Sequence, residues 1–170
     1  ADCGIEQYTR TMQGLQCAVT EEKTLTAETA AALPGTGESV LDITGSFAAG
    51  SAAPATGQVS VQGTLQIQIC SQNTDTGELT VRSKDLAVQQ TLELPGVTED
   101  DTALVRGEVL ACTLSAVDGA GEASLSVTWK LRVEVWRSVQ HTVVADAYST
   151  LCKTQTVQTV CRLLQKTADL

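Results

Sequence analysis

Aromatic side chains, histidine and basic residues are scarce in this chain of 170 residues. Phe, Trp and Tyr make up 3% of the sequence, one residue is histidine, and 11 basic residues are outnumbered by 20 acidic ones, giving a formal net charge of −9. Nucleic-acid binding needs a field that neutralises phosphates, and single strands also need aromatic side chains on which bases stack. We therefore expect no nucleic-acid partner.

Long apolar runs are also lacking. Apolar runs such as Ala30 to Leu33 and Val143 to Ala145 fall far short of the roughly 20 residues that span a bilayer, so we expect no membrane insertion. The chain has a single histidine, His141, so most histidine-based catalysis is not expected, although composition alone leaves the activity open. The hydrophobic fraction is nevertheless 42%, which predicts a core of Val, Leu, Ile and Ala.

Alternation of apolar and polar residues is the dominant pattern. From Leu125 to Val139 one parity is apolar, comprising Leu125, Val127, Trp129, Leu131, Val133 and Val135. A second alternating segment has Val59, Val61, Leu65, Ile67 and Ile69 on one parity. A period of two is typical of half-buried strands and not of amphipathic helices.

Shorter candidate strands are separated by turn-forming residues. The strands are Ser39 to Phe47, Glu78 to Arg82, Leu86 to Leu94 and Leu104 to Leu114; the turns are Gly50 to Gly57, Asn73 to Gly77, Pro95-Gly96 and Asp118 to Gly121. Short strands at this spacing favour antiparallel pairing, because parallel strands need longer crossover connections. The expected fold is therefore all-β, an antiparallel β-sandwich or barrel-like structure.

The two ends of the chain are less regular. Leu15, Cys17 and Val19 alternate as in a strand, whereas the Ala-rich segment from Thr26 to Leu33 is compatible with a helical turn. Near the C-terminus, Val157, Val160, Cys161 and Leu164 fit the helix template, although one strand face fits as well. We expect one β domain over residues 1–150, followed by a segment, 151–170, that forms a short C-terminal helix or begins a next unit.

Six cysteines are scattered along the chain: Cys3, Cys17, Cys70, Cys112, Cys152 and Cys161. None forms a C-x-x-C pair, so a zinc site is not expected. Cys112 is in phase with Leu110 and Leu114, as expected of a small buried hydrophobe. We interpret the set as free thiols, while short Cys3–Cys17 or Cys152–Cys161 bridges stay open.

Three other motifs have simpler readings than the sites they resemble. Residues 33–37 (LPGTG) match a cell-wall sorting signal, but no apolar span and basic tail follow, so we read a Pro-Gly turn. His141, Asp146 and Cys152 contain the residue types of a thiol hydrolase without any oxyanion element nearby. Residues 73–78 resemble part of a calcium loop, but too few ligands are present and a hairpin turn is expected. We therefore predict no catalytic, cofactor or metal site.

The two tryptophans differ in their expected surroundings. Trp129 belongs to the apolar parity of its strand, whereas Trp136 lies on the polar parity. Trp136 is either covered by a terminal segment, which we favour, or exposed as an anchor for a partner. Trp136 is the first candidate interaction residue, and Tyr148 is the second.

The order of several segments resembles the SPOCS domain family, the spore-coat-associated domains of endospore-forming bacteria. The resemblance covers about residues 14 to 150 and rests on VLDI at 40–43, GQVSVQGTL at 57–65, LELPG at 92–96, the strand from Leu125 to Trp136, and DAYST at 146–150. It implies a non-enzymatic β domain, often repeated and sometimes followed by a LysM module. No LysM pattern is visible in this sequence.

The resemblance implies a structural, protein-interaction role in assembling the spore coat or envelope, with other coat proteins as partners. It places the protein in the mother-cell cytoplasm at the forespore surface, where thiols are expected to be reduced. Sheet edges offer a route to self-association. The alternative is a secreted or surface β-sandwich that binds a glycan or another ligand, favoured by the Ser/Thr/Gly-rich strands.

Overall fold

The structure is a computed structural model that describes residues 4–32, 37–116 and 122–151, together with Lys153, Gln155 and Val157. Several sequence-based expectations lie outside these residues: the state of Cys3, Cys152 and Cys161, the turn at Asp118 to Gly121, most of the 33–37 motif and the short C-terminal helix. The part of the chain that the structure describes contains no apolar helix of membrane-spanning length.

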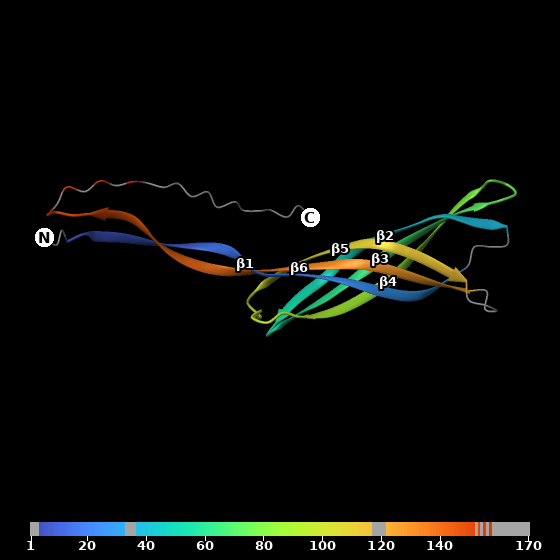
Figure 1. The fold of residues 1–170 in the computed structure, drawn as a ribbon, viewed down its shortest axis with the longest axis horizontal. Helices are drawn as coiled ribbons and strands as arrows, with labels where there is room; N and C mark the ends of the chain where they lie inside the picture. The colour runs from blue at the N-terminus through green and yellow to red at the C-terminus, as the bar shows by residue number, and fades with distance from the viewer. Residues whose placement is uncertain are drawn as a thin grey trace. The chain divides into compact units, whose positions relative to one another are not determined.

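Six strands form two three-stranded sheets (Figure 1). The strands are β1 (Glu6–Ala32), β2 (Glu38–Ala55), β3 (Gln58–Asn73), β4 (Leu79–Glu93), β5 (Thr102–Ala116) and β6 (Glu122–Tyr148). One sheet has the order β1-β6-β5 and the other has the order β2-β3-β4. The antiparallel sheets pack together, which confirms the expected all-β sandwich.

The chain divides into two compact units. Unit 1 comprises Ala1–Gly14 and Val139–Leu170, and unit 2 is Leu15–Ser138. Unit 2 contains β2, β3, β4 and β5 and the hydrophobic core, together with the adjoining parts of β1 and β6. Parts of the same two strands lie in unit 1.

The core of unit 2 comes mainly from the two central strands. β6 contributes Leu125, Val127, Trp129, Leu131, Val133 and Val135, and β3 contributes Val59, Val61, Leu65, Ile67 and Ile69. These are the two apolar parities that the alternation singled out. Burial of these side chains is the main stabilising contribution of the sandwich, because it removes aliphatic surface from water.

An aromatic pair lies at the centre of this core and is fitted around two glycines. The rings of Phe47 on β2 and Trp129 on β6 stack with centroids 5.2 Å apart and an interplanar angle of 16°. A Cβ added at Gly107 on β5 would lie 2.4 Å from the Phe47 ring, and one added at Gly63 on β3 would lie 2.5 Å from it. Glycine at these positions leaves the space that the only phenylalanine occupies.

The loop between β4 and β5 is fixed by a partly buried ion pair between Arg137 and Asp101. The Arg137 guanidinium donates to both carboxylate oxygens of Asp101 at 2.7 and 2.6 Å and to the carbonyl of Gly96 at 2.7 Å. The backbone N–H of Thr98 also donates to Asp101, at 2.9 Å. Asp101 is therefore only 6% exposed although it lies in an acidic loop that also contains Glu99 and Asp100.

Two predicted local features are also corrected. The Ala-rich segment from Thr26 is not a helical turn, because β1 continues to Ala32 and Ala31 is buried in the core. The predicted turn at Gly50 to Gly57 is mostly strand: β2 runs to Ala55 and pairs with β3 there, so only the residues next to the positive-φ Gly57 turn.

The register of β5 changes once along the strand. It shifts between Val109 and Ala111 in the pairing with β6. Leu110 is therefore 50% exposed, whereas Cys112 and Leu114 pack against the core. The predicted common phase of these three residues was wrong for Leu110, because a bulge inserts one unpaired residue and reverses the alternation.

Candidate functional site

Trp136 lies in unit 2, opposite Thr102 in the β5–β6 pairing. It is half-buried, and its indole Nε1 is buried without a hydrogen-bond partner among the residues that the structure describes. A buried N–H without an acceptor costs stability and is uncommon in folded proteins. The side chain is therefore a partly covered aromatic, which makes it a poorer candidate than an exposed residue for the first contact with a partner.

Tyr148, the second predicted interaction residue, ends β6 in unit 1. Its side chain is 49% exposed, and its hydroxyl donates a hydrogen bond to the carboxylate of Glu6 on β1. This hydrogen bond raises the pKa of the phenol above its ordinary value, with a smaller contribution from desolvation. Tyr148 thus remains accessible while its hydroxyl is held in place.

Unit 1 exposes a group of apolar side chains on paired strands. We call residues 6–14 of β1 and 139–148 of β6 the ribbon, since the two strands are neighbours in one sheet. Exposed hydrophobic residues on the ribbon are Tyr8, Met12, Val143, Val144 and Tyr148, and Ile5 precedes it. Side chains two apart on a strand share a face, so the Tyr148–Glu6 hydrogen bond places Tyr8 on the face that carries Tyr148.

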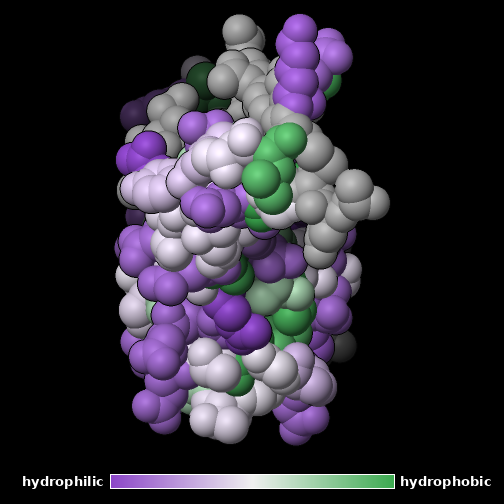
Figure 2. Space-filling model, turned by 90° about the vertical axis from the view of Figure 1, so that its left-hand side faces the viewer, coloured by the Kyte–Doolittle hydropathy of each residue, from purple (hydrophilic) through white to green (hydrophobic). Residues whose placement is uncertain are grey.

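The exposed apolar side chains are set among hydrophilic ones. The face drawn in Figure 2 is mainly hydrophilic, with separate hydrophobic residues between the polar ones. Single exposed hydrophobic residues are ordinary on protein surfaces. The ribbon is distinctive because several exposed hydrophobic residues, two of them tyrosines, occur within two short paired strand segments.

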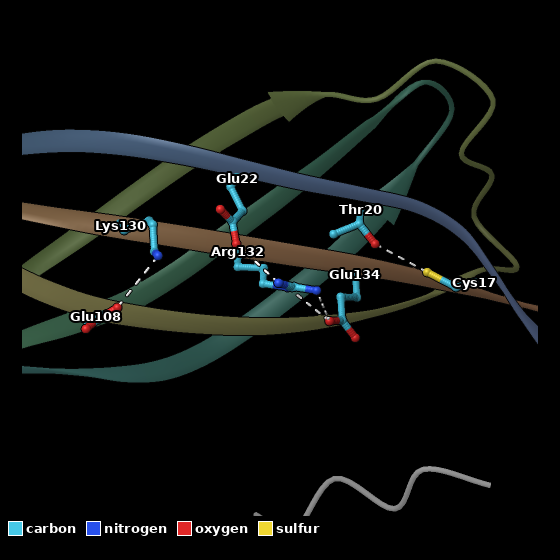
Figure 3. A network of polar contacts seen from close by, with 7 residues as sticks. All are labelled: Cys17, Thr20, Glu22, Glu108, Lys130, Arg132 and Glu134. Carbon is cyan, nitrogen blue, oxygen red and sulfur yellow. Dashed lines mark hydrogen bonds and ion pairs between the residues drawn. The ribbon is translucent and has the colours of Figure 1, made fainter. Parts of the chain in front are cut away.

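The outer face of the β1-β6-β5 sheet in unit 2 is charged. Figure 3 shows Lys130 near Glu108, at 3.7 Å, and Arg132 between Glu22 and Glu134, at 3.2 and 3.0 Å. Their exposure to solvent makes each pair worth little in stability. These five groups are two cations and three carboxylates, and both cations are paired, so the contacts leave no free cation among them to attract an anionic ligand.

The outer face of the β2-β3-β4 sheet is mostly uncharged and carries an open hollow. The register aligns side chains across the three strands in two adjacent rows, Thr44–Gln68–Ser83 and Ser46–Gln66–Asp85. These six side chains, with Gly45 and Ile67, line a hollow of about 390 Å³ that we call the polar hollow. Its lining contains two amides, three hydroxyls and one carboxylate.

The side chains of the polar hollow differ from their neighbours on the same face. Ser51 donates to Gln62, Ser60 is within hydrogen-bond distance of Thr91, and the Gln72 amide donates to the Gly77 carbonyl. Among the described residues, by contrast, none of the six side chains named for the polar hollow has a hydrogen-bond or ion-pair partner. Their donors and acceptors are therefore open to solvent or a ligand.

The edge strand β4 is poorly suited to pairing over its full length with a strand of another protein. It has a hydrogen-bonded neighbour on one side only in the described sheet. Arg82 and Lys84 lie opposite Ile69 and Ile67, on the parity that faces the core, and Arg82 forms a bidentate pair with Glu38. Charged residues in such positions hinder edge-to-edge pairing.

The described cysteines and acidic residues form no metal site. Cys17, Cys70 and Cys112 are free thiols, and burial raises the pKa of Cys112. Within the described part of the chain, no three His, Cys, Asp or Glu residues lie together as metal ligands require. The predicted calcium-like loop is a hairpin turn in which the Asn73 side chain accepts from two backbone N–H groups.

Comparison of the chain with protein-family models, with curated proteins and with solved structures finds no match. The resemblance to SPOCS domains therefore rests on the order of the sequence segments alone.

Sequence reasoning missed the polar hollow as a site. Gln66 and Gln68 stand out only as the polar parity of their strand, and nothing in one strand shows which residues flank them. The turn at Asn73 to Gly77 was a usable signal, since a hairpin there sets the register that brings Gln68 opposite Ser83.

Proposed function

We propose that this chain is a non-catalytic structural module that binds other proteins during assembly of the spore coat or envelope. The resemblance to SPOCS domains supports the setting, at the forespore surface in the mother cell. The observation that carries the interaction role is the exposed apolar group on the ribbon, with Tyr8 at 66% and Tyr148 at 49% exposure.

The ribbon consists of two paired strands with exposed apolar side chains. A two-stranded ribbon is marginally stable by itself in water, and it gains stability when a hydrophobic face packs against another element. Tyr8 and Val144 leave apolar surface exposed on such a ribbon. Covering this surface with a partner protein stabilises both the ribbon and the complex.

The ribbon chemistry favours a protein partner. Tyrosine combines a large apolar ring with a hydroxyl, and this combination is enriched at protein interfaces. The Tyr148 hydroxyl is already oriented by Glu6, so less side-chain freedom is lost when the ring is covered. We therefore propose Tyr148 as an interaction residue, with the half-buried Trp136 as a weaker candidate.

The test is fractionation of sporulating cells that produce the full chain. The wild-type protein is expected in forespore and coat fractions, whereas a Tyr8→Ser/Val144→Ser variant is expected to leave them. Leu41→Ser is the matched control, because Leu41 is an exposed aliphatic residue on β2, 55% exposed, outside the ribbon. Circular dichroism of the purified variants verifies that they fold.

Two outcomes would contradict the proposal. One is absence of the wild-type protein from forespore and coat fractions, which removes the proposed setting. The other is retention of the folded ribbon variant at the wild-type level, which removes the ribbon as the contact surface.

A further inference from the structure

We propose that the polar hollow on the β2-β3-β4 sheet binds a neutral, polyhydroxylated ligand, of which a chain of sugars bearing hydroxyl and acetamido groups is the best fit. This role is separate from protein binding by the ribbon. The size of the hollow, the chemistry of its lining and its charge all suit such a ligand.

The size and position of the hollow suit part of an extended ligand. Its volume of about 390 Å³ lies within the roughly 300–1,000 Å³ typical of small-molecule sites. All three strands contribute to it, and the pairings of β3 with β2 and β4 fix the backbone on both sides. A ligand bound across the two rows therefore meets positions that are already set by the sheet.

The lining matches neutral hydrogen-bonding groups. Each amide of Gln66 and Gln68 offers two N–H donors and one carbonyl acceptor, which complement an acetamido group or a pair of sugar hydroxyls. Thr44, Ser46 and Ser83 add hydroxyls that both donate and accept. Because these side chains have no partner among the described residues, binding a ligand breaks no existing contact of theirs within the protein.

Charge excludes the main competing ligand class. The lining includes the carboxylate of Asp85 but no lysine or arginine, and the chain carries a net charge of −9. An anionic ligand would be repelled at this site, whereas a neutral one is accepted and can donate a hydroxyl hydrogen to Asp85. The lining has no aromatic ring on which a sugar could stack, so hydrogen bonds must supply the affinity.

The experiment titrates the full chain with defined oligosaccharides and follows backbone and side-chain amides by nuclear magnetic resonance. The probes are the hexasaccharide of N-acetylglucosamine, maltohexaose and the acidic hexagalacturonate. At about 10 mM probe, a Kd of about 1 mM gives roughly nine-tenths occupancy. The two neutral probes are expected to shift Gln66, Gln68 and Ser83, the acetamido one more strongly, and the acidic probe is expected to shift none.

The variant Gln66→Val/Gln68→Val tests the lining without disturbing a strand, since valine suits β structure. It is expected to bind the acetamido probe about tenfold more weakly, as the loss of two hydrogen bonds implies. Gln62→Val is the matched control: Gln62 lies on the same face of β3 but outside the hollow, and its expected change is less than twofold.

Three results would overturn the proposal: no shift at the hollow with either neutral probe, equal shifts with the acidic probe, or equal weakening by Gln62→Val. All three leave the ribbon proposal intact, because the ribbon residues lie in the other unit.

Discussion

The fit of Phe47 against Gly107 provides the sharpest test of the core. In Gly107→Ala the added Cβ would lie 2.4 Å from two ring atoms of Phe47 and 2.8 Å from its Cβ. Ordinary contact begins at 3.4 Å, so the overlap with the ring is 1.0 Å. The ring cannot move freely, because it stacks on the buried Trp129.

The expected cost follows from this overlap. Inserting a methyl group into a well-packed core typically destabilises by about 1–3 kcal/mol. For a protein of this size each 1 kcal/mol lowers the Tm by about 2–4 °C, so Gly107→Ala is expected to lower the Tm by about 2–12 °C. Gly14→Ala is the control, since its Cβ would meet only a His141 atom at 3.9 Å. Alanine there is expected to be neutral or to stabilise by up to about 1 kcal/mol.

A double-mutant cycle identifies the ring as the cause. Phe47→Ala removes the ring atoms but leaves its own Cβ close to the new methyl group, so the cost of Gly107→Ala is expected to shrink without vanishing. We expect a coupling of about 1 kcal/mol or more, measured by urea unfolding monitored by circular dichroism. Equal costs of Gly107→Ala in both backgrounds, within about 0.5 kcal/mol, would refute the packing of Phe47 against Gly107.

Three further predictions test the ion pair, the core and the thiols. The pKa of Asp101 is lowered to about 2 from 3.8, chiefly by the Arg137 hydrogen bonds, so its stabilising contribution is present above about pH 4 and is lost as the pH falls towards 2. In acid unfolding, the free energy of unfolding should fall less over this pH range in Asp101→Asn than in the wild type. The control Asp100→Asn should behave as the wild type. Identical curves for all three proteins would contradict this prediction. Trp129→Ala should destabilise by about 3–5 kcal/mol in urea unfolding, and a cost below about 1 kcal/mol would show that this ring is not packed in the core. The exposed Cys17 should react with a maleimide faster than Cys112, whose pKa is raised by burial, as measured by peptide mass spectrometry; equal rates would argue against the burial of Cys112.

The regular part of the fold was predictable because alternation is a local signal. In the strand that begins at Leu125, the position of each apolar residue in the alternation indicates the face of the sheet on which it lies. The structure buries these apolar residues as expected. The same holds for the strand that contains Val59 and Ile69. Odd or even position along a strand suffices to predict which side chains are buried wherever the strand has no bulge. This prediction failed at Leu110 because the register of β5 shifts there.

The features that could not be predicted depend on partners far away in sequence. Asp101 looks like any acidic loop residue until Arg137, 36 positions later, is brought beside it. Likewise, Gly63 and Gly107 carry no sign that both accommodate Phe47. The polar hollow requires three strands in one register, so no single segment reveals it.

The central claim, that the ribbon contacts a protein of the spore envelope, is tested most directly by photo-crosslinking in sporulating cells. A photoreactive phenylalanine derivative replaces Tyr8 in one strain and Leu41 in another, since both side chains are more than half exposed. Position 8 is expected to yield a discrete adduct with a coat or envelope protein that position 41 does not yield. No adduct at position 8, or the same adducts from both positions, would contradict the claim.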